Sequence, residues 1–225
     1  MPVDPNATIE ISAFAWVPPF AQGLVRDLRV RWALEEAGLS YRERLLNARN
    51  ERPKEYFFEQ PFGQVPIYND GDIRMFETGA IVLYIAERSD VLMPRDPLGR
   101  ARTMVWVLAS LNSIEPMLLE LANVDVFAKD EEWAKLRRPS LIEWIRKRLG
   151  HLSDALAERD FLEERFTVAD LMMTTVLRNL RKTDLVAEHP NLARYQARCE
   201  ARPAFKRALE AQLAPFKQPQ SAETV

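Results

Sequence analysis

Apolar and polar positions follow two different periods along this chain, and the first half shows both. Residues 9–14 alternate apolar and polar side chains, which predicts a strand, and a second strand is predicted over residues 41–46. Between them, the apolar positions from about residue 21 or 22 to residue 37 recur with a helical period, and Gly38 follows as a C-terminal cap. A strand, a helix and a strand in this order predict two parallel strands joined by a right-handed crossover.

A hairpin followed by a helix is predicted further along. Residues 65–68 are rich in β-formers, residues 69–72 read Asn-Asp-Gly-Asp as in a turn between antiparallel strands, and residues 73–76 form the return strand. Glu77 and Thr78 then stand at the start of an apolar helical pattern. A carboxylate and a hydroxyl beside the backbone N–H groups of a helix N-terminus predict a site for a small charged ligand.

The second half has a helical period throughout and no strand pattern. A Pro- and Gly-containing linker separates the two halves, so we predict an α/β domain over 1–88, a linker over 89–99 and an all-α domain over 100–225. The helices predicted for the all-α domain cover 100–123, 131–157, 171–180, 190–201 and 203–213. Pro116 is expected to kink the first of them and Pro139 to divide or bend the second. A polar tail is predicted over 217–225. Thr167 and Asp170 have the spacing of a capping box.

The composition is that of a globular protein without a strong electrostatic field. The 225 residues include 31 Lys and Arg against 33 Asp and Glu, so the net charge of −2 gives no reason to expect nucleic acid or an anionic membrane as partner. No apolar run approaches the roughly 20 residues that span a bilayer, and residues 1–6 show neither the charged region nor the apolar region of a signal sequence. We therefore expect a cytoplasmic protein.

Cysteine and histidine are too few for a metal cluster. The one cysteine, Cys199, stands in a helical context and is expected to be a half-buried helix residue, and it excludes a disulfide within the chain. The two histidines, His151 and His189, are far apart and have no neighbouring ligand residues. We expect no metal cofactor.

Three short motifs around the predicted hairpin resemble the glutathione-binding half of the glutathione S-transferase family. They read Gly-Gln-Val-Pro over 63–66, Asp-Gly over 70–71 and Glu-Thr-Gly-Ala-Ile over 77–81, with Thr78 in place of the usual Ser. The resemblance implies a cytosolic-type member of unassigned class, with a thioredoxin-like α/β domain followed by a helical bundle. The phrase around Thr167 and Asp170 resembles the family's buried structural capping motif.

The same resemblance implies where glutathione binds. Glu77 and Thr78 would hold the γ-glutamyl end, Val65, followed by a cis bond to Pro66, the cysteinyl backbone, and Gln64 the peptide or the glycyl carboxylate. Arg52 or Lys54 would add a positive charge at that carboxylate, or each is a solvated loop cation instead. Glutathione is thus the implied co-substrate.

The side chain that activates the thiol in this family is missing. Most members place a Tyr, Ser or Cys after the first strand or at the start of the first helix, whereas residues 15–24 contain none of them. In one register, residues 18–22 resemble the omega-class Cys-Pro-Phe-Ala-Gln with Pro18 in place of Cys, and in a second the position falls near Leu24. The candidates left are the Gln22 amide and backbone N–H groups around Ala21, Gln22 and Gly23.

Several aromatic residues have two interpretations each. Trp16, Phe20 and Trp106 are candidates for an apolar electrophile pocket, or they pack in the core or at a dimer interface. An aromatic run at Tyr56, Phe57 and Phe58 is expected to be exposed and to anchor the partner subunit of a homodimer, as the resemblance implies.

Two functions follow. The first is a detoxifying enzyme that binds glutathione, stabilises its thiolate and conjugates it to a small apolar electrophile. The second is a glutathione-binding or interaction protein with the same fold and no turnover, which the missing thiol-activating residue favours. Disulfide exchange of the glutaredoxin kind would need an active-site cysteine, and Cys199 is far from the loop.

Overall fold

The computed structural model describes residues 3–217, and the chain forms two compact units. The first comprises Met1–Ser89 with the segment from Pro203 onward, and the second comprises Asp90–Arg202. Apart from Lys217, the predicted polar tail lies outside the described residues.

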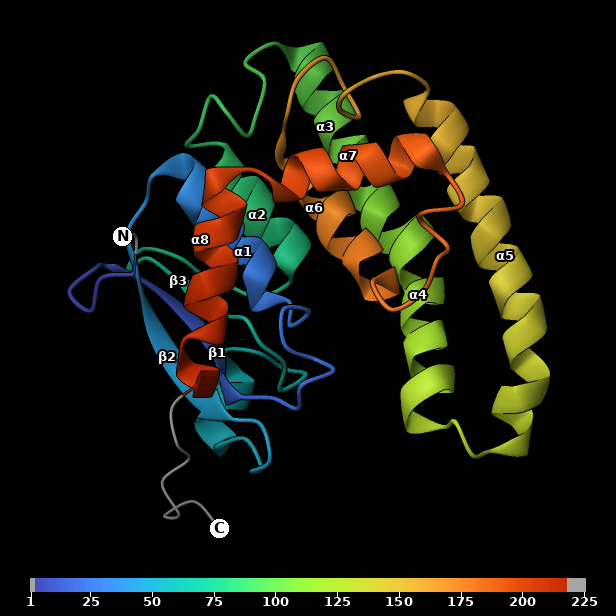
Figure 1. Ribbon diagram of the computed structural model, residues 1–225. Helices are drawn as coiled ribbons and strands as arrows, with labels where there is room; N and C mark the ends of the chain where they lie inside the picture. The colour runs from blue at the N-terminus through green and yellow to red at the C-terminus, as the bar shows by residue number, and fades with distance from the viewer. Residues whose placement is uncertain (1–2, 218–225) are drawn as a thin grey trace. The chain divides into compact units, whose positions relative to one another are not determined.

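The first unit is built on a four-stranded mixed sheet with the strand order β2-β1-β3-β4. Its strands are β1 (Ile9–Trp16), β2 (Tyr41–Asn47), β3 (Tyr68–Asn69) and β4 (Arg74–Met75). Figure 1 labels three of these strands, β1, β2 and β3. β1 pairs with β2 in parallel and with β3 in antiparallel, and β3 and β4 form the antiparallel hairpin. The predicted α/β arrangement is confirmed, with a return strand shorter than expected.

The first helix begins later than the apolar period predicted. α1 (Asp27–Ala37) starts about five residues after the expected position, because the preceding residues form turns and Gly23 has a φ of +74°, outside the helical region. Its end is as predicted: Gly38 has a φ of +67° and its N–H donates to carbonyls of the last turn. A short 3₁₀ helix, η1 (Lys54–Phe58), follows β2, and α2 (Thr78–Ala86) follows β4.

The last helix, α8 (Pro203–Leu213), packs against α1 in the first unit (Figure 1). The Trp32 and Phe205 rings meet edge to face with centroids 4.8 Å apart, and Arg207 Nε lies 2.6 Å from the buried Glu35 carboxylate. The prediction assigned residues 100–225 to one all-α domain, whereas α8 and the short η5 (Pro215–Lys217) belong to the first compact unit. The ring contact and the ion pair with α1 hold α8 there.

A charged network buried in the first unit fixes the start of α1. Asp27 accepts from Arg31 Nε at 2.7 Å and from Gln212 Nε2 of α8 at 2.6 Å, while the Arg31 guanidinium also reaches Glu43 of β2. Burial raises the pKa of Asp27, and hydrogen bonds from Arg31 and Gln212 oppose that rise. Because removal of one partner would leave a buried charge unpaired, this network specifies where α1, β2 and α8 meet.

The second unit contains helices only, within its described residues. They are α3 (Pro97–Ala109), η2 (Ser110–Ile114), α4 (Glu115–Ala122), η3 (Asn123–Phe127), α5 (Glu132–Leu156), α6 (Val168–Leu177), η4 (Arg178–Leu180) and α7 (Pro190–Glu200). With α8 of the first unit, these are the helices predicted for the second half of the chain, and the long first one is interrupted by the wide π turns η2 and η3.

The two internal prolines have different effects. Pro116 stands in the first turn of α4, directly after the wide turn η2. Proline has no backbone N–H, so one hydrogen bond of the regular helix is missing here, which accounts for the break in the helix before it. Pro139, by contrast, lies inside α5 without dividing that 25-residue helix.

The predicted capping box at α6 is confirmed. Thr167 Oγ1 accepts from the Ala169 N–H, and the Asp170 carboxylate accepts from the N–H groups of Thr167 and Leu162, each at 2.8 Å. Tyr195 of α7 donates to the same carboxylate at 3.2 Å. Asp170 thus has a structural role, joining the start of α6 to the preceding loop and to α7.

One helical run in the described part of the chain, Pro97–Phe127, is long and apolar enough to cross a membrane by length and composition alone. Part of this run packs in the core of the helical unit: Val107, Ser110, Leu118 and Leu121 are buried, and α3 packs against α6. Its exposed apolar residues include Met104, Val105 and Leu108. The run therefore has one side packed within the unit and another that exposes apolar side chains.

Candidate functional site

A pocket in the first unit brings together most of the predicted glutathione-binding residues. It is lined by Arg26, Gln60, Gln64, Val65, Pro66, Glu77 and Thr78. Five of them, Gln64, Val65, Pro66, Glu77 and Thr78, are residues that the motifs around the hairpin singled out. The Val65–Pro66 peptide bond is cis, as the resemblance implied.

The backbone at Glu77 is in the left-handed region. Its φ is +68° and its ψ is 110°, values that a non-glycine residue adopts at a cost of about 1–3 kcal/mol. This conformation lets the chain turn from β4 directly into α2, with the exposed Glu77 side chain at the pocket and the first N–H groups of the helix beside it. Strained residues cluster at ligand-binding sites, which makes Glu77 a candidate functional residue.

Thr78 is held by a buried cation. Its hydroxyl oxygen accepts from Arg29 Nη1 of α1 at 3.3 Å, and both side chains are almost fully buried. Because the Arg29 bond uses an acceptor site on Thr78 Oγ1, the hydroxyl proton is available to donate to an anionic group in the pocket. The N-termini of α1 and α2 are joined by this contact.

A chain of hydrogen bonds supports the wall formed by residues 64–67. The Ile67 N–H donates to Ser12 Oγ at 2.8 Å, Ser12 Oγ and Tyr56 Oη lie 2.9 Å apart, and Tyr56 Oη donates to the Gln64 carbonyl at 2.6 Å. Since the Tyr56 proton points at Gln64, the hydroxyl of Ser12 donates to Tyr56. Burial raises the pKa of Tyr56. These two residues position the Val65–Pro66 segment from behind.

The expectation that Tyr56, Phe57 and Phe58 are all exposed is wrong for one of the three. Tyr56 is buried and serves the wall of the pocket, whereas Phe57 and Phe58 are exposed as expected. The sequence pattern did not separate them, because all three are aromatic and adjacent in one short helix.

Arg52 is not among the residues that line the pocket. Its guanidinium donates to the backbone carbonyls of Asn47, Asn50 and Gly63 at 2.7, 3.0 and 3.2 Å, and it lies 4.9 Å from the centroid of the Phe14 ring. These contacts brace the loop between β2 and the pocket wall. Its predicted contact with glutathione stays a prediction.

Two of the candidate thiol-activating groups in the loop after β1, the Gln22 amide and the Ala21 N–H, are engaged within that loop. Gln22 Nε2 donates to the Val17 carbonyl at 3.2 Å, and the Ala21 N–H donates to the Pro18 carbonyl at 2.9 Å. Gly23 is buried and forms a turn. Neither Gln22 nor Gly23 lines the pocket described above, so their catalytic role stays a prediction.

Arg26 and Gln60 are pocket residues that the sequence reasoning missed. The helix was predicted to begin near residue 21, which made Arg26 an ordinary helix residue rather than one at the helix start. A signal was present: the second register placed the thiol-activating position near Leu24, two residues before this arginine. Gln60 is buried, and its Oε1 accepts from the Phe62 N–H at 2.7 Å.

The three predicted electrophile-pocket residues belong to different units. Trp16 and Phe20 lie in the first unit, both half-buried, and the Trp16 ring is 4.5 Å from the Arg49 guanidinium. Trp106 lies on α3 of the second unit, where its Nε1 donates to Glu163 at 3.1 Å. Their joint role stays a prediction.

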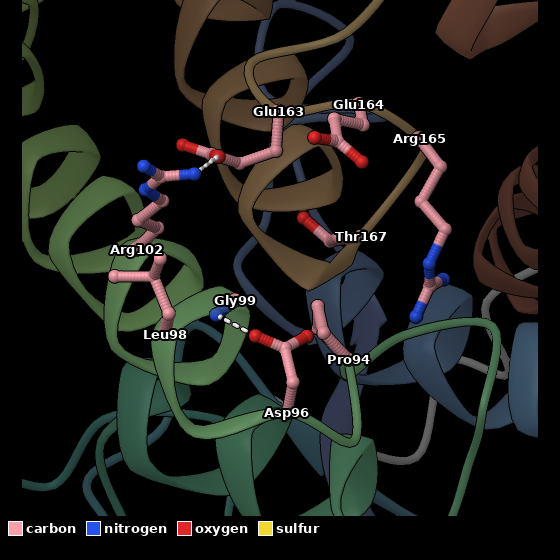
Figure 2. A pocket seen from close by; sticks show the side chains of 9 residues that line it. All are labelled: Pro94, Asp96, Leu98, Gly99, Arg102, Glu163, Glu164, Arg165 and Thr167. Atoms are coloured by element: carbon pink, nitrogen blue, oxygen red, sulfur yellow. Dashed lines mark hydrogen bonds and ion pairs between the residues drawn. The ribbon is translucent and has the colours of Figure 1, made fainter.

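A second pocket, of about 340 Å³, lies within the helical unit between the start of α3 and the loop before α6 (Figure 2). Asp96 accepts from the Gly99 N–H at 2.7 Å, Arg102 lies 3.9 Å from Glu163, and Arg165 donates to the Val91 carbonyl at 2.7 Å. Because these charges are directed at neighbouring protein groups, they do not converge on one point in the pocket.

Two further chemistries have no support in residues 3–217. No group of three or more His, Cys, Asp or Glu side chains there is placed to hold a metal ion. Cys199 is fully buried rather than half-buried as expected, and burial raises the pKa of its thiol to about 12. A thiol of that kind is not a nucleophile near neutral pH.

Comparison with protein-family models gives two matches. The glutathione S-transferase N-terminal domain matches residues 22–87, and the glutathione S-transferase C-terminal domain matches residues 119–212. The pocket, from Arg26 to Thr78, lies inside the first match.

Individual proteins agree with the family models. The chain is 31% identical over 195 residues to maleylacetoacetate isomerase of Rhizobium meliloti, covering 80% of this chain and 89% of that protein. It is also 31% identical over 162 residues to glutathione S-transferase F14 of Arabidopsis thaliana, covering 64% of this chain and 62% of that protein. A glutathione transferase from Burkholderia graminis, solved with two glutathione molecules bound per subunit, has 27% identity and a TM-score of 0.79, covering 90% of this chain and 88% of that one.

Proposed function

Because the chain belongs to the glutathione S-transferase family, we propose that it binds glutathione and transfers the glutathione sulfur to a small apolar electrophile. The observation that carries this proposal is the pocket where Glu77 and Thr78, at the start of α2, face the cis Val65–Pro66 segment.

Each part of glutathione has a complementary group in this pocket. The Glu77 carboxylate suits the γ-glutamyl ammonium, and the Thr78 hydroxyl with the N-terminus of α2 suits the γ-glutamyl carboxylate. The Val65 backbone suits the cysteinyl part in the manner of an added strand, and the Gln64 amide suits the peptide or the glycyl end. A solved relative binds glutathione, which supports the same ligand here.

The transfer reaction needs the thiolate beside an apolar surface. Trp16 and Phe20 of the first unit supply aromatic surface for an apolar electrophile, and the role of Trp106 stays a prediction. The expected group that holds the thiolate is a backbone N–H or an amide near Gln22 and Gly23, since the loop has no hydroxyl or thiol between residues 15 and 24.

The second candidate function is glutathione binding without turnover. The absence of Tyr, Ser and Cys from residues 15–24 favours it, and so does the engagement of Gln22 by the Val17 carbonyl. Both functions require the pocket at α2, and they differ only in whether the bound sulfur is ionised and reactive.

Two measurements separate these functions. Calorimetry with glutathione tests the pocket, and the absence of any affinity in the unmodified protein would overturn both functions. Conjugation of an aryl halide, measured for the parent and for Gln22→Ala, then tests turnover. Tight glutathione binding with no product across a broad panel of electrophiles would establish the binder instead.

We further propose a homodimer in the cytoplasm. Phe58 has 89% of its surface exposed beside the exposed Phe57, and Val105 of α3 has 64% beside the exposed Met104 and Leu108, and grouped apolar side chains of this kind suit an interface. We propose that a second copy of the chain, rather than lipid, packs on the apolar side of α3, because the charged Arg100 and Arg102 lie within that helix.

A further inference from the structure

We infer that Arg26 is a catalytic residue that supplies the positive charge holding the glutathione sulfur as a thiolate, in place of the missing hydroxyl or thiol. This inference rests on the proposed function, since it assigns a role in the same pocket. The observation behind it is that Arg26, at the start of α1, lines the same pocket as Val65, Glu77 and Thr78.

The position of Arg26 on α1 follows from its neighbour one turn later. Arg26 and Arg29 are three residues apart, and the Arg29 N–H donates to the Arg26 carbonyl at 3.1 Å, so the two side chains share one face of the helix start. Arg29 reaches Thr78 at the start of α2. Arg26 therefore stands on the side of α1 that faces the pocket, one turn nearer the loop where the thiol-activating residue was expected.

The charges around the pocket make this arginine distinctive. Among the lining residues that the structure describes, Arg26 is the one cation and Glu77 the one acid. Glu77 is matched to the γ-glutamyl ammonium, and Thr78 with the N-terminus of α2 to the γ-glutamyl carboxylate. This assignment leaves the cysteinyl part, beside Val65, for the half-buried Arg26.

A guanidinium is suited to this task. An opposite charge within about 4–6 Å lowers the pKa of an acid by roughly 1–3 units, and a free thiol starts near about 8.5. Arginine stays protonated at any pH at which a thiol ionises. In the transfer step, the sulfur lone pair forms the bond to the aryl carbon, the halide leaves with its electron pair, and the thiol proton has already passed to solvent.

The test measures the pKa of the bound thiol directly. Glutathione bound to the parent protein is titrated by the ultraviolet absorbance of its thiolate, alongside Arg26→Gln, Arg26→Lys and the control Arg74→Gln, an exposed arginine on β4 outside the pocket. We expect Arg26→Gln to raise the pKa of the bound thiol by about one unit, Arg26→Lys to raise it less, and Arg74→Gln to leave it unchanged.

A second ligand excludes a role in binding alone. S-methylglutathione keeps both carboxylates but has no ionisable sulfur, so its affinity for Arg26→Gln should fall by no more than about threefold, against about tenfold for glutathione above the pKa of its bound thiol. Equal losses for both ligands, or an unchanged pKa of the bound thiol in a variant that still binds, would overturn this assignment and leave the proposed function standing. No glutathione binding by the folded parent would overturn the proposed function itself.

Discussion

At the scale of single residues, Glu77 combines a strained backbone with an exposed carboxylate at the pocket. Its φ of +68° is tolerated by glycine at little cost but not by alanine or glutamate. Strain of this kind is kept where a side chain has a task that packing does not require. Glu77 therefore allows stability and function to be separated at one position.

We expect Glu77→Ala and Glu77→Gly both to lose most of the glutathione affinity, since both remove the carboxylate. Their folding stabilities should differ: Glu77→Gly relieves the backbone and should be more stable than Glu77→Ala by about 1 kcal/mol. Calorimetry gives the affinity and urea unfolding gives the stability. Unchanged affinity in both variants would remove Glu77 from the site, and equal stabilities would show that the backbone strain is small.

At the scale of elements, the hairpin before α2 is held by one carboxylate. Asp70 accepts from Arg88 Nη2 at 2.6 Å, from the hydroxyls of Tyr84 and Tyr68 at 3.1 and 3.2 Å, and from the Ile73 N–H at 3.0 Å. Burial alone would raise the pKa of Asp70, but the hydrogen bonds from Ile73, Arg88 and Tyr84 outweigh it and lower that pKa to about 2. The turn is thus tied to the end of α2.

Because the pKa of Asp70 is lower in the folded protein than its ordinary value of 3.8, the folded state favours the ionised carboxylate. Its stabilisation is present above about pH 4 and is lost as the pH falls to about 2. We expect Asp70→Asn to lower the free energy of unfolding by roughly 1–3 kcal/mol at neutral pH and by progressively less in acid. Denaturant unfolding at several pH values checks this, and a pH-independent difference between parent and variant would contradict it.

The start of α6 gives a second prediction at this scale. The Asp170 carboxylate accepts from two buried N–H groups, one on each oxygen, as well as from Tyr195. An asparagine has one acceptor oxygen, so Asp170→Asn leaves a buried N–H facing an NH₂ group and should cost about 1–3 kcal/mol of unfolding free energy.

The control is an exposed acid on the same unit, for example Asp154→Asn, which should change the free energy of unfolding by less than about 0.5 kcal/mol. Equal effects of Asp170→Asn and Asp154→Asn in thermal or urea unfolding would contradict the structural role of Asp170.

At the scale of the whole molecule, the exposed apolar residues decide how many chains associate. Phe58 and Val105 lie in different compact units, and both present most of their surface to solvent in the single chain. A partner that covers these apolar side chains would remove them from water, which favours association. The proposed homodimer would bury both.

We expect light scattering to give a mass of about 52 kDa for the parent, twice the 26.0 kDa of one chain. Phe58→Asp or Val105→Asp should shift that mass toward 26.0 kDa, because burying an unpaired carboxylate at an interface is costly. Asp154→Asn, at an exposed polar position on α5, serves as a control that leaves the mass unchanged. A parent that is already monomeric would contradict the dimer.

The sequence by itself determined the elements whose signals are local. The hairpin turn at Asp70-Gly71, the αL cap at Gly38, the capping box at Asp170 and most helix ranges needed only residue types and spacing, since turns and caps are interactions between near neighbours. The motifs at 63–66 and 77–81 likewise predicted five of the pocket residues.

Only the tertiary structure decided what depends on contacts between distant residues. It moved the start of α1 to Asp27, where Gln212 of α8 binds it, and it grouped α8 with the first unit. It buried Tyr56 behind the pocket wall, turned Arg52 toward loop carbonyls and brought Arg26 into the pocket. Periodicity cannot predict these outcomes, because the partners lie up to 185 residues apart along the chain and the interactions exist only once the units are folded.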